Sequence, residues 1–134
     1  MKIVVDTNRI IAALIKNGMS RKILFSKNFE FVTPDHSLSE IHKYEEVIKK
    51  KAHITHEEFE ILLSIIFERI EIIPKLDYEK FLGECGSLIS DVGDILFLAV
   101  ATALKTDGVW SDDTHFDEQD KIKVFKTKNM INEI

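Results

Sequence analysis

The sequence predicts a three-layer α/β/α domain with a short, mainly parallel central sheet. Short β-branched runs recur along the chain, helical segments separate them, and no linker, internal repeat or low-complexity tract interrupts the series. Parallel neighbours need a crossover, usually a helix, so this alternation is typical of such a sheet. The chain has 134 residues, which is the usual size of one domain, so residues 1–134 are expected to form a single domain.

Strands are expected where a short apolar run ends at an acid, a proline or a turn. The first run is β-branched and ends at Asp6, the second ends at Pro34, and the third ends at Pro74. Proline ends a strand because it cannot donate to the hydrogen-bond ladder. The expected strands, in chain order, are residues 3–5, 29–33, 71–73, 109–111 and 123–125.

Helices are expected from capping residues and from apolar positions at helical spacing. Ser37 with Glu40, and Thr55 with Glu58, match the capping box that opens a helix. Apolar residues follow the second box at i, i+3, i+4 and i+7 as far as Ile70. The helix expected at 94–104 is apolar almost all round and should be deeply buried. The expected helices cover about 10–15 (stopping near Gly18), 23–25, a segment from 37, 55–70, 77–82 and 94–104.

Composition narrows the classes of protein to a soluble globule. Hydrophobic residues make up 45% and charged residues 31% of the sequence. Cys85 is the only cysteine, which excludes an intramolecular disulfide and a thiolate zinc site and leads us to expect a cytoplasmic protein. The apolar N-terminus is interrupted by Asp6 and Arg9, so neither a signal peptide nor a membrane helix is expected.

The formal net charge of -5 argues at first against a nucleic-acid partner. If four acids hold cations, the remaining charge is -5 + 4 = -1, and Lys49, Lys50 and Lys51 form a local basic run. That run is interpreted more simply as a solvated helix end.

Four acids are expected to converge at one edge of the sheet. Asp6 and Asp113 follow apolar strands, while Glu40 and Asp94 lie in the first turns of helices that begin at the same edge. Structural roles compete with this interpretation: Glu40 can serve only its capping box, Asp94 only the helix dipole, and Asp113 only a turn. Asp6 is harder to explain in this way because a charge after a buried strand needs a partner.

Such a cluster predicts metal-dependent phosphodiester hydrolysis. Two carboxylates 4 Å apart repel by ~4 kcal/mol at an effective dielectric of 20, and no lysine or arginine lies beside the acids to offset this. Hard oxygen ligands favour Mg²⁺ or Mn²⁺, which can hold a phosphodiester and activate water. The histidines have no H-E-x-x-H context, so no zinc site is expected and most of them are interpreted as solvated.

Four segments, in order, resemble the motifs of the PIN-domain family, in particular its small toxin ribonucleases of the VapC type. These segments are Val5-Asp6-Thr7-Asn8, Leu38-Ser39-Glu40-Ile41, Asp94 to Ala101, and Trp110 to Phe116. The resemblance implies a PIN-like fold and a metal-dependent endoribonuclease with Asp6, Glu40, Asp94 and Asp113 as catalytic metal ligands. It also implies an RNA substrate, a homodimer and an antitoxin protein as partner. The residues expected to support the site are Thr7, Asn8, Asp91, Ser111 and Asp112.

Two departures from the family pattern leave ligands open. His115 stands where the family often has another acid, and Asp91 and Asp112 compete with Asp94 and Asp113. A haloacid-dehalogenase-like phosphatase would need a second aspartate at Asn8, and a receiver domain would need an acidic pair before the first strand. The remaining alternative is a PIN-like RNA- or protein-binding subunit, or an RNA-processing subunit, without toxin role or turnover.

Overall fold

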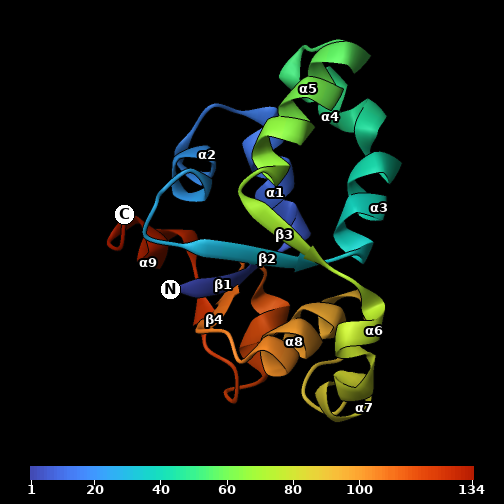
Figure 1. Ribbon diagram of the computed structural model, residues 1–134, viewed down its shortest axis with the longest axis vertical. Coiled ribbons are helices and arrows are strands. Elements are labelled where there is room, and N and C mark those ends of the chain that lie inside the picture. The colour runs from blue at the N-terminus through green and yellow to red at the C-terminus, as the bar shows by residue number, and fades with distance from the viewer.

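The computed structural model describes residues 1–134 and has the expected three-layer α/β/α architecture. Five strands form one sheet in the order β3-β2-β1-β4-β5, and every neighbouring pair is parallel. Helices α1 to α5 cover one face of the sheet, and α6 to α8 cover the other (Figure 1). The strands are β1 (Lys2–Val5), β2 (Glu30–Pro34), β3 (Ile70–Ile73), β4 (Gly108–Trp110) and β5 (Val124–Phe125).

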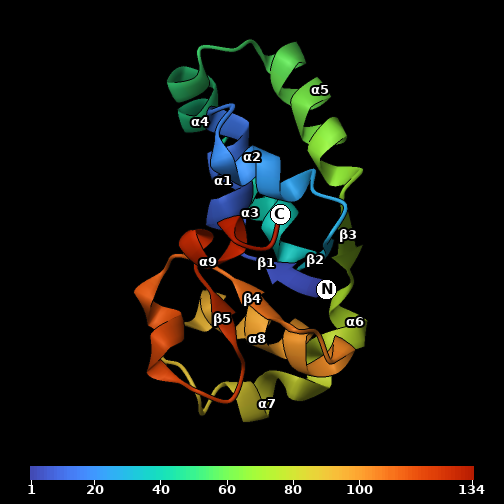
Figure 2. The ribbon, with the colours of Figure 1, turned by 90° about the vertical axis from the view of Figure 1, so that its left-hand side faces the viewer.

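The helices are short, and most of them connect one strand to the next. None combines the length and the apolar character needed to cross a bilayer. They are α1 (Thr7–Ile15), α2 (Met19–Leu24), α3 (His36–Lys43), α4 (Glu45–Ala52), α5 (His56–Phe67), α6 (Lys75–Tyr78), α7 (Leu82–Cys85), α8 (Val92–Leu104) and α9 (Thr127–Ile131), with 3-10 turns η1 (Glu79–Phe81) and η2 (Thr114–Glu118). The C-terminal α9 lies beside α2 (Figure 2).

The sheet is buried on both faces, and this makes it a rigid base for the residues at its edge. In β1, Ile3 and Val5 belong to the apolar core under α1 to α5, whereas Val4 belongs to the core against α8. All three are fully buried. A parallel strand covered on both faces is expected to be continuously apolar, as this one is. Asp6 therefore follows a segment that has little freedom to move.

One expected helix start is wrong. Asp35, not Ser37, is the N-cap of α3, because its Oδ1 accepts a hydrogen bond from the backbone N–H of His36 at 3.0 Å. Ser37 lies inside the helix, is fully buried, and its Oγ is 2.8 Å from Oγ1 of Thr33. The Ser37–Glu40 pair is therefore no capping box, and Glu40 is free to take part in other contacts.

The second capping box is confirmed, although its helix is shorter than expected. Thr55 and Glu58 make both reciprocal hydrogen bonds, but α5 ends at Phe67 and Ile70 already belongs to β3. The helix expected from Asp77, with Asp77 as its cap, begins instead at Lys75, and Pro74 is its N-cap. The break between α3 and α4, and the short helix α9, were not expected from the sequence.

Gly108 is the one glycine at which a side chain cannot fit. A Cβ there would lie 2.5 Å from the carbonyl oxygen of Lys123 and 2.7 Å from a ring carbon of Phe125. We expect Gly108→Ala to lower the free energy of unfolding by ~1–3 kcal/mol because β4 and β5 must move apart. Urea unfolding measures this change. The matched control is Gly83→Ala, where a Cβ meets nothing within 4 Å and stability should be kept or raised. Equal stability of the two variants would contradict the expectation.

Candidate active site

Asp6 lies at the carboxyl end of β1, where the chain turns into α1. Its side chain is buried, and its Oδ2 accepts a hydrogen bond from Oγ of Ser111 at 2.6 Å. Its backbone N–H donates to the carbonyl oxygen of Trp110 at 3.1 Å, which ties it to β4. Burial raises the pKa of the Asp6 carboxyl, although hydrogen bonds from Ser111 and the Asn8 backbone lower it, and the charge of Asp113 adds to the rise.

Asp91 and Asp94 lie at the start of α8, which begins at Val92 and not at Asp94 as expected. Asp91 is the N-cap, since its Oδ1 accepts from the backbone N–H of Asp94 at 3.1 Å. The Asp94 side chain is only 14% exposed. Burial raises the pKa of Asp94 to about 6, with further increases from the charges of Asp91, Asp113 and Asp6 and a decrease from the hydrogen bond with His115.

Asp112 and Asp113 are adjacent but bind different parts of the protein. Asp113 caps η2 through a 2.9 Å hydrogen bond from the backbone N–H of His115, and its charge acts on both Asp6 and Asp94. Asp112 faces α1 and α9. Its carboxylate accepts two 2.7 Å hydrogen bonds from Thr127 and lies 3.0 Å from Nη1 of Arg9. The structure therefore gives Asp112 a structural role and leaves Asp113 with the other acids.

Partial burial raises the pKa of the Asp112 carboxyl, but the Thr127 hydrogen bonds and the charges of Arg9 and Lys126 outweigh it and hold that pKa below its ordinary value. Asp112→Asn should therefore lower the free energy of unfolding by about 1 kcal/mol, because it removes an ion pair and weakens charge-assisted bonds. Thermal melts measure the loss. The variant should still respond to added metal as the wild type does. A lost metal response at unchanged stability would make Asp112 the ligand in place of Asp113.

Glu40 lies at the edge of the cluster formed by Asp6, Asp94 and Asp113 and is not one of its main charges. Oγ1 of Thr7 lies 2.9 Å from Oε1 of Glu40 and 3.0 Å from Oγ of Ser37, so Thr7, the residue that follows Asp6, connects the start of α1 to the Glu40 carboxylate. Nε2 of His36 lies 3.7 Å from the same Glu40 oxygen. The expected convergence of four acids is thus seen as three aspartates, with Glu40 held beside them through Thr7. Asn8 is exposed on α1.

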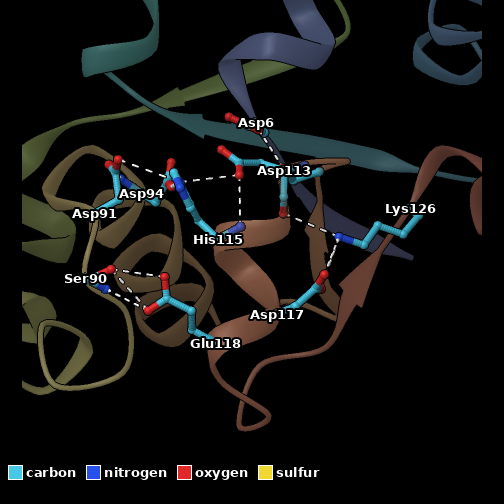
Figure 3. Close-up of polar contacts among 10 residues, drawn as sticks. Asp6, Ser90, Asp91, Asp94, Asp113, His115, Asp117, Glu118 and Lys126 are labelled. Carbon is cyan, nitrogen blue, oxygen red and sulfur yellow. Dashed lines mark hydrogen bonds and ion pairs between the residues drawn. The ribbon is translucent and has the colours of Figure 1, made fainter.

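The position of His115 among the acids was not expected from the sequence, which indicated only that this residue replaces an acid of the family pattern. Its Nδ1 lies 3.2 Å from Oδ2 of Asp94, 3.4 Å from Oδ1 of Asp113 and 3.7 Å from Oδ2 of Asp91 (Figure 3). The charge of Asp113 and the hydrogen bond with Asp94 raise the pKa of the imidazole. The available signal was its place two residues after Asp113 in a motif where the family often has an acid.

The donor set fits a hard divalent cation. Neither lysine nor arginine forms an ion pair with the carboxylates of Asp6, Asp94 or Asp113. Lys126, the lysine labelled in Figure 3, contacts the backbone carbonyl of Asp113 and pairs with Asp117. Burial is the main cause of the raised pKa values of Asp6 and Asp94, and the charges of neighbouring aspartates add to it; a bound cation would offset both effects.

The sequence matches a known protein family, and the fold is similar to a solved structure. The PIN-domain family matches residues 4–131, which is nearly the whole chain. The chain belongs to the PIN-domain family. Its fold is similar to a chain in the crystal structure of VapBC2 from Rickettsia felis bound to a DNA fragment from their promoter. The TM-score is 0.73 at 21% sequence identity, covering 94% of this chain and 98% of that one. No curated protein matches the sequence.

Membership of the PIN-domain family confirms the resemblance drawn from the four motifs and supports a nuclease. The match begins at Val4, just before Asp6, and ends after the fourth motif, so all four segments lie inside it. The similarity to the VapBC2 chain concerns the fold, because the two sequences are only 21% identical. The roles of individual acids in this chain therefore rest on the contacts described above.

Proposed function

We propose that this protein is a metal-dependent endoribonuclease that hydrolyses RNA phosphodiester bonds with Mg²⁺ or Mn²⁺. The observation that carries the proposal is the convergence of Asp6, Asp94 and Asp113 from β1, α8 and the segment after β4, with no lysine or arginine to neutralise them. Family membership supports a nuclease, and carboxylate-bound divalent ions are a common means of cleaving phosphodiesters.

In this proposal the chain's own residues hold and orient the metal ligands. Asp6, Asp94 and Asp113 are the principal ligands, and Glu40 completes the set from α3. Ser111 fixes the Asp6 carboxylate, and Thr7 fixes that of Glu40. When bound, the ion would activate water and neutralise charge on the phosphate. Asp91 supports the set as the cap that orients the first turn of α8.

A hollow beside Glu40 offers a lysine and a histidine side chain to the RNA backbone. It has a volume of about 330 Å³ and is lined by Asp35, His36, Ser39, Lys75, Tyr78 and Leu96. His36 lies next to Glu40, and Lys75 follows the carboxyl end of β3. A phosphate there would gain contacts with a lysine and a histidine in an otherwise acidic protein. This supports an RNA strand that runs past the acids toward α6.

Cleavage of a labelled single-stranded RNA by the purified protein tests the proposal. Cutting is expected with millimolar Mg²⁺ or Mn²⁺ and none in excess chelator, with recovery when metal is added back. Internal cuts in an RNA blocked at both ends distinguish an endonuclease from an exonuclease. Equal cleavage in excess chelator would refute the metal mechanism. Metal binding without any cleavage would favour the alternative of a PIN-like binding or RNA-processing subunit.

We also propose an antitoxin protein as partner, which would make this chain the toxin of a pair. The similar chain of known structure belongs to VapBC2. On this protein, an apolar hollow of about 250 Å³ opens between α3 and α5, lined in part by Leu38, Leu63, Phe67 and Ile72. Mixing with the product of a small neighbouring gene should give a stable complex in gel filtration and suppress cleavage. Unchanged cleavage and separate elution would reject the partner.

A homodimer is the third part of the proposal. On α5, Ile61 is 61% exposed and Ile65 is 42% exposed, so packing within this chain leaves part of the apolar surface of the helix uncovered. Exposed apolar residues that gather on one helix are typical of an interface. Light scattering at micromolar concentration should give twice the chain mass of 15.5 kDa. A mass of one chain would remove the dimer and leave the nuclease proposal intact.

A further inference from the structure

His115 places an imidazole nitrogen among the carboxylates of the proposed metal site. Figure 3 shows the ring lying between Asp94 on one side and Asp113 on the other. Its Nδ1 is within 3.7 Å of three carboxylate oxygens that come from two different segments of the chain. An all-carboxylate set would have no nitrogen at this point.

The backbone fixes the histidine in this position. The N–H of His115 donates to Oδ1 of Asp113 at 2.9 Å, so His115 lies in the first turn of η2 at a set distance from the acid that caps it. The next residue, Phe116, is fully buried and packs edge-on against Phe97 of α8 with ring centroids 6.3 Å apart. The 3-10 turn that carries His115 is therefore anchored to the helix that carries Asp94. The imidazole reaches the acids because of this packing, although half of its own surface is exposed.

The spacing of the donor atoms suits coordination to one ion. Ligands at right angles around an ion with bonds of ~2.1 Å lie ~3 Å apart. The distances of 3.2 Å from Nδ1 of His115 to Oδ2 of Asp94 and 3.4 Å to Oδ1 of Asp113 are close to that value. Small side-chain adjustments would then allow the nitrogen and two carboxylate oxygens to share a cation.

We propose that His115 is a nitrogen ligand of the metal and makes the site prefer Mn²⁺, or a similar first-row transition ion, over Mg²⁺. This inference rests on the proposed function, since it assigns the metal of the same site. Mg²⁺ takes oxygen ligands almost exclusively, whereas first-row transition ions also accept imidazole, Mn²⁺ less strongly than Fe²⁺, Ni²⁺ or Zn²⁺. Replacing one carboxylate by a neutral imidazole weakens the site for Mg²⁺ more than for Mn²⁺, because Mg²⁺ depends more on charged oxygens.

Metal binding without RNA tests the inference directly. Isothermal titration of the full-length protein with Mn²⁺ and with Mg²⁺ gives the two dissociation constants, and pulsed electron paramagnetic resonance of the Mn²⁺ form detects a coordinated ¹⁴N nucleus. The wild type should bind Mn²⁺ at least about tenfold more tightly than Mg²⁺ and show imidazole nitrogen coupling. His115→Asp should lose the coupling and bring the two constants closer, and His115→Asn should lose the coupling and bind both ions more weakly.

The matched control is His56→Gln, because His56 also contacts a carboxylate, with its Nδ1 2.7 Å from Oε2 of Glu45. Glu45, His56 and Glu60 form a second group of close donor atoms, on α4 and α5. His56→Gln should keep the nitrogen coupling and the Mn²⁺ preference. Coupling that persists in His115→Asp but disappears in His56→Gln would move the nitrogen ligand to that second group and overturn the inference.

The remaining outcomes separate this inference from the proposed function. If both ions bind equally and Mn²⁺ shows no nitrogen coupling, His115 is not a ligand, while a metal-dependent nuclease still stands. If neither ion binds at millimolar concentration, both proposals fail. Because His115 is half exposed, its variants should remain folded, and their melting curves in chelator check this.

Discussion

Asp6→Asn is expected to lower the rate of metal-dependent RNA cleavage by at least about a hundredfold. Asp6 is buried, follows β1 directly, and is held in place by the hydrogen bond that its Oδ2 accepts from Ser111. Asparagine keeps the shape and can still accept the Ser111 hydrogen bond, but it removes the negative charge. The loss should therefore fall on catalysis and not on folding. Cleavage of labelled RNA at saturating Mn²⁺ measures the rate.

The stability of the same variant separates a catalytic role from a structural one. Burial raises the pKa of Asp6, so the ionised carboxylate is unfavourable in the empty folded protein. Asp6→Asn should consequently unfold in chelator at the same temperature as the wild type or at a higher one. Asp112→Asn serves as the control, with lower stability and retained cleavage. An inactive Asp6→Asn variant that is also unfolded would show only a structural role, and an active one would remove Asp6 from the site.

Millimolar Mn²⁺ is expected to raise the melting temperature of the wild type by on the order of 10 °C. A ligand at 100 times its dissociation constant stabilises a protein by ~2.7 kcal/mol, which accounts for a shift of that size in a domain of this length. Relief of the repulsion among Asp6, Asp94 and Asp113 provides the stabilisation. Melts with chelator and with Mn²⁺ at matched ionic strength measure it, because equal screening cannot then imitate binding.

Asp94→Asn should show a much smaller shift and equal or higher stability without metal. The pKa of Asp94 is raised to about 6, so the empty folded protein binds this proton more tightly than the unfolded chain does. The stability of the empty protein therefore falls as the pH rises toward and through about 6. The melts should be recorded at pH 7.5, where Asp94 is ionised and the repulsion is fully present. The control is Asp91→Asn, since asparagine also caps helices well. An unchanged shift in Asp94→Asn, with a lost shift in Asp91→Asn, would exchange the two roles.

Local patterns predicted most of the fold. The β-branched run before Asp6, the prolines at 34 and 74 and the Thr55–Glu58 capping box all mark elements that the structure confirms. Errors arose where two patterns overlapped. Ile70 continues the helical spacing of α5 but begins β3, because pairing with Phe31 of β2 decides its backbone. Ser37 has the right spacing for a cap, but Asp35 takes that position and Ser37 is buried against Thr33.

The sequence by itself determined the family, the alternation of strands and helices, and the expectation that Asp6, Glu40 and one acid from each of the pairs Asp91/Asp94 and Asp112/Asp113 lie at one edge of the sheet. A buried strand that ends at an acid is a local pattern, and parallel strands bring their carboxyl ends together. Only the tertiary structure decided which of two neighbouring acids joins the site and that His115 lies among them. Arg9 and Thr127 bind the Asp112 carboxylate on the side away from the other acids. The packing of Phe116 on Phe97 positions His115 beside Asp94. These partners are distant in sequence, so local spacing carries no information about the direction in which each side chain points.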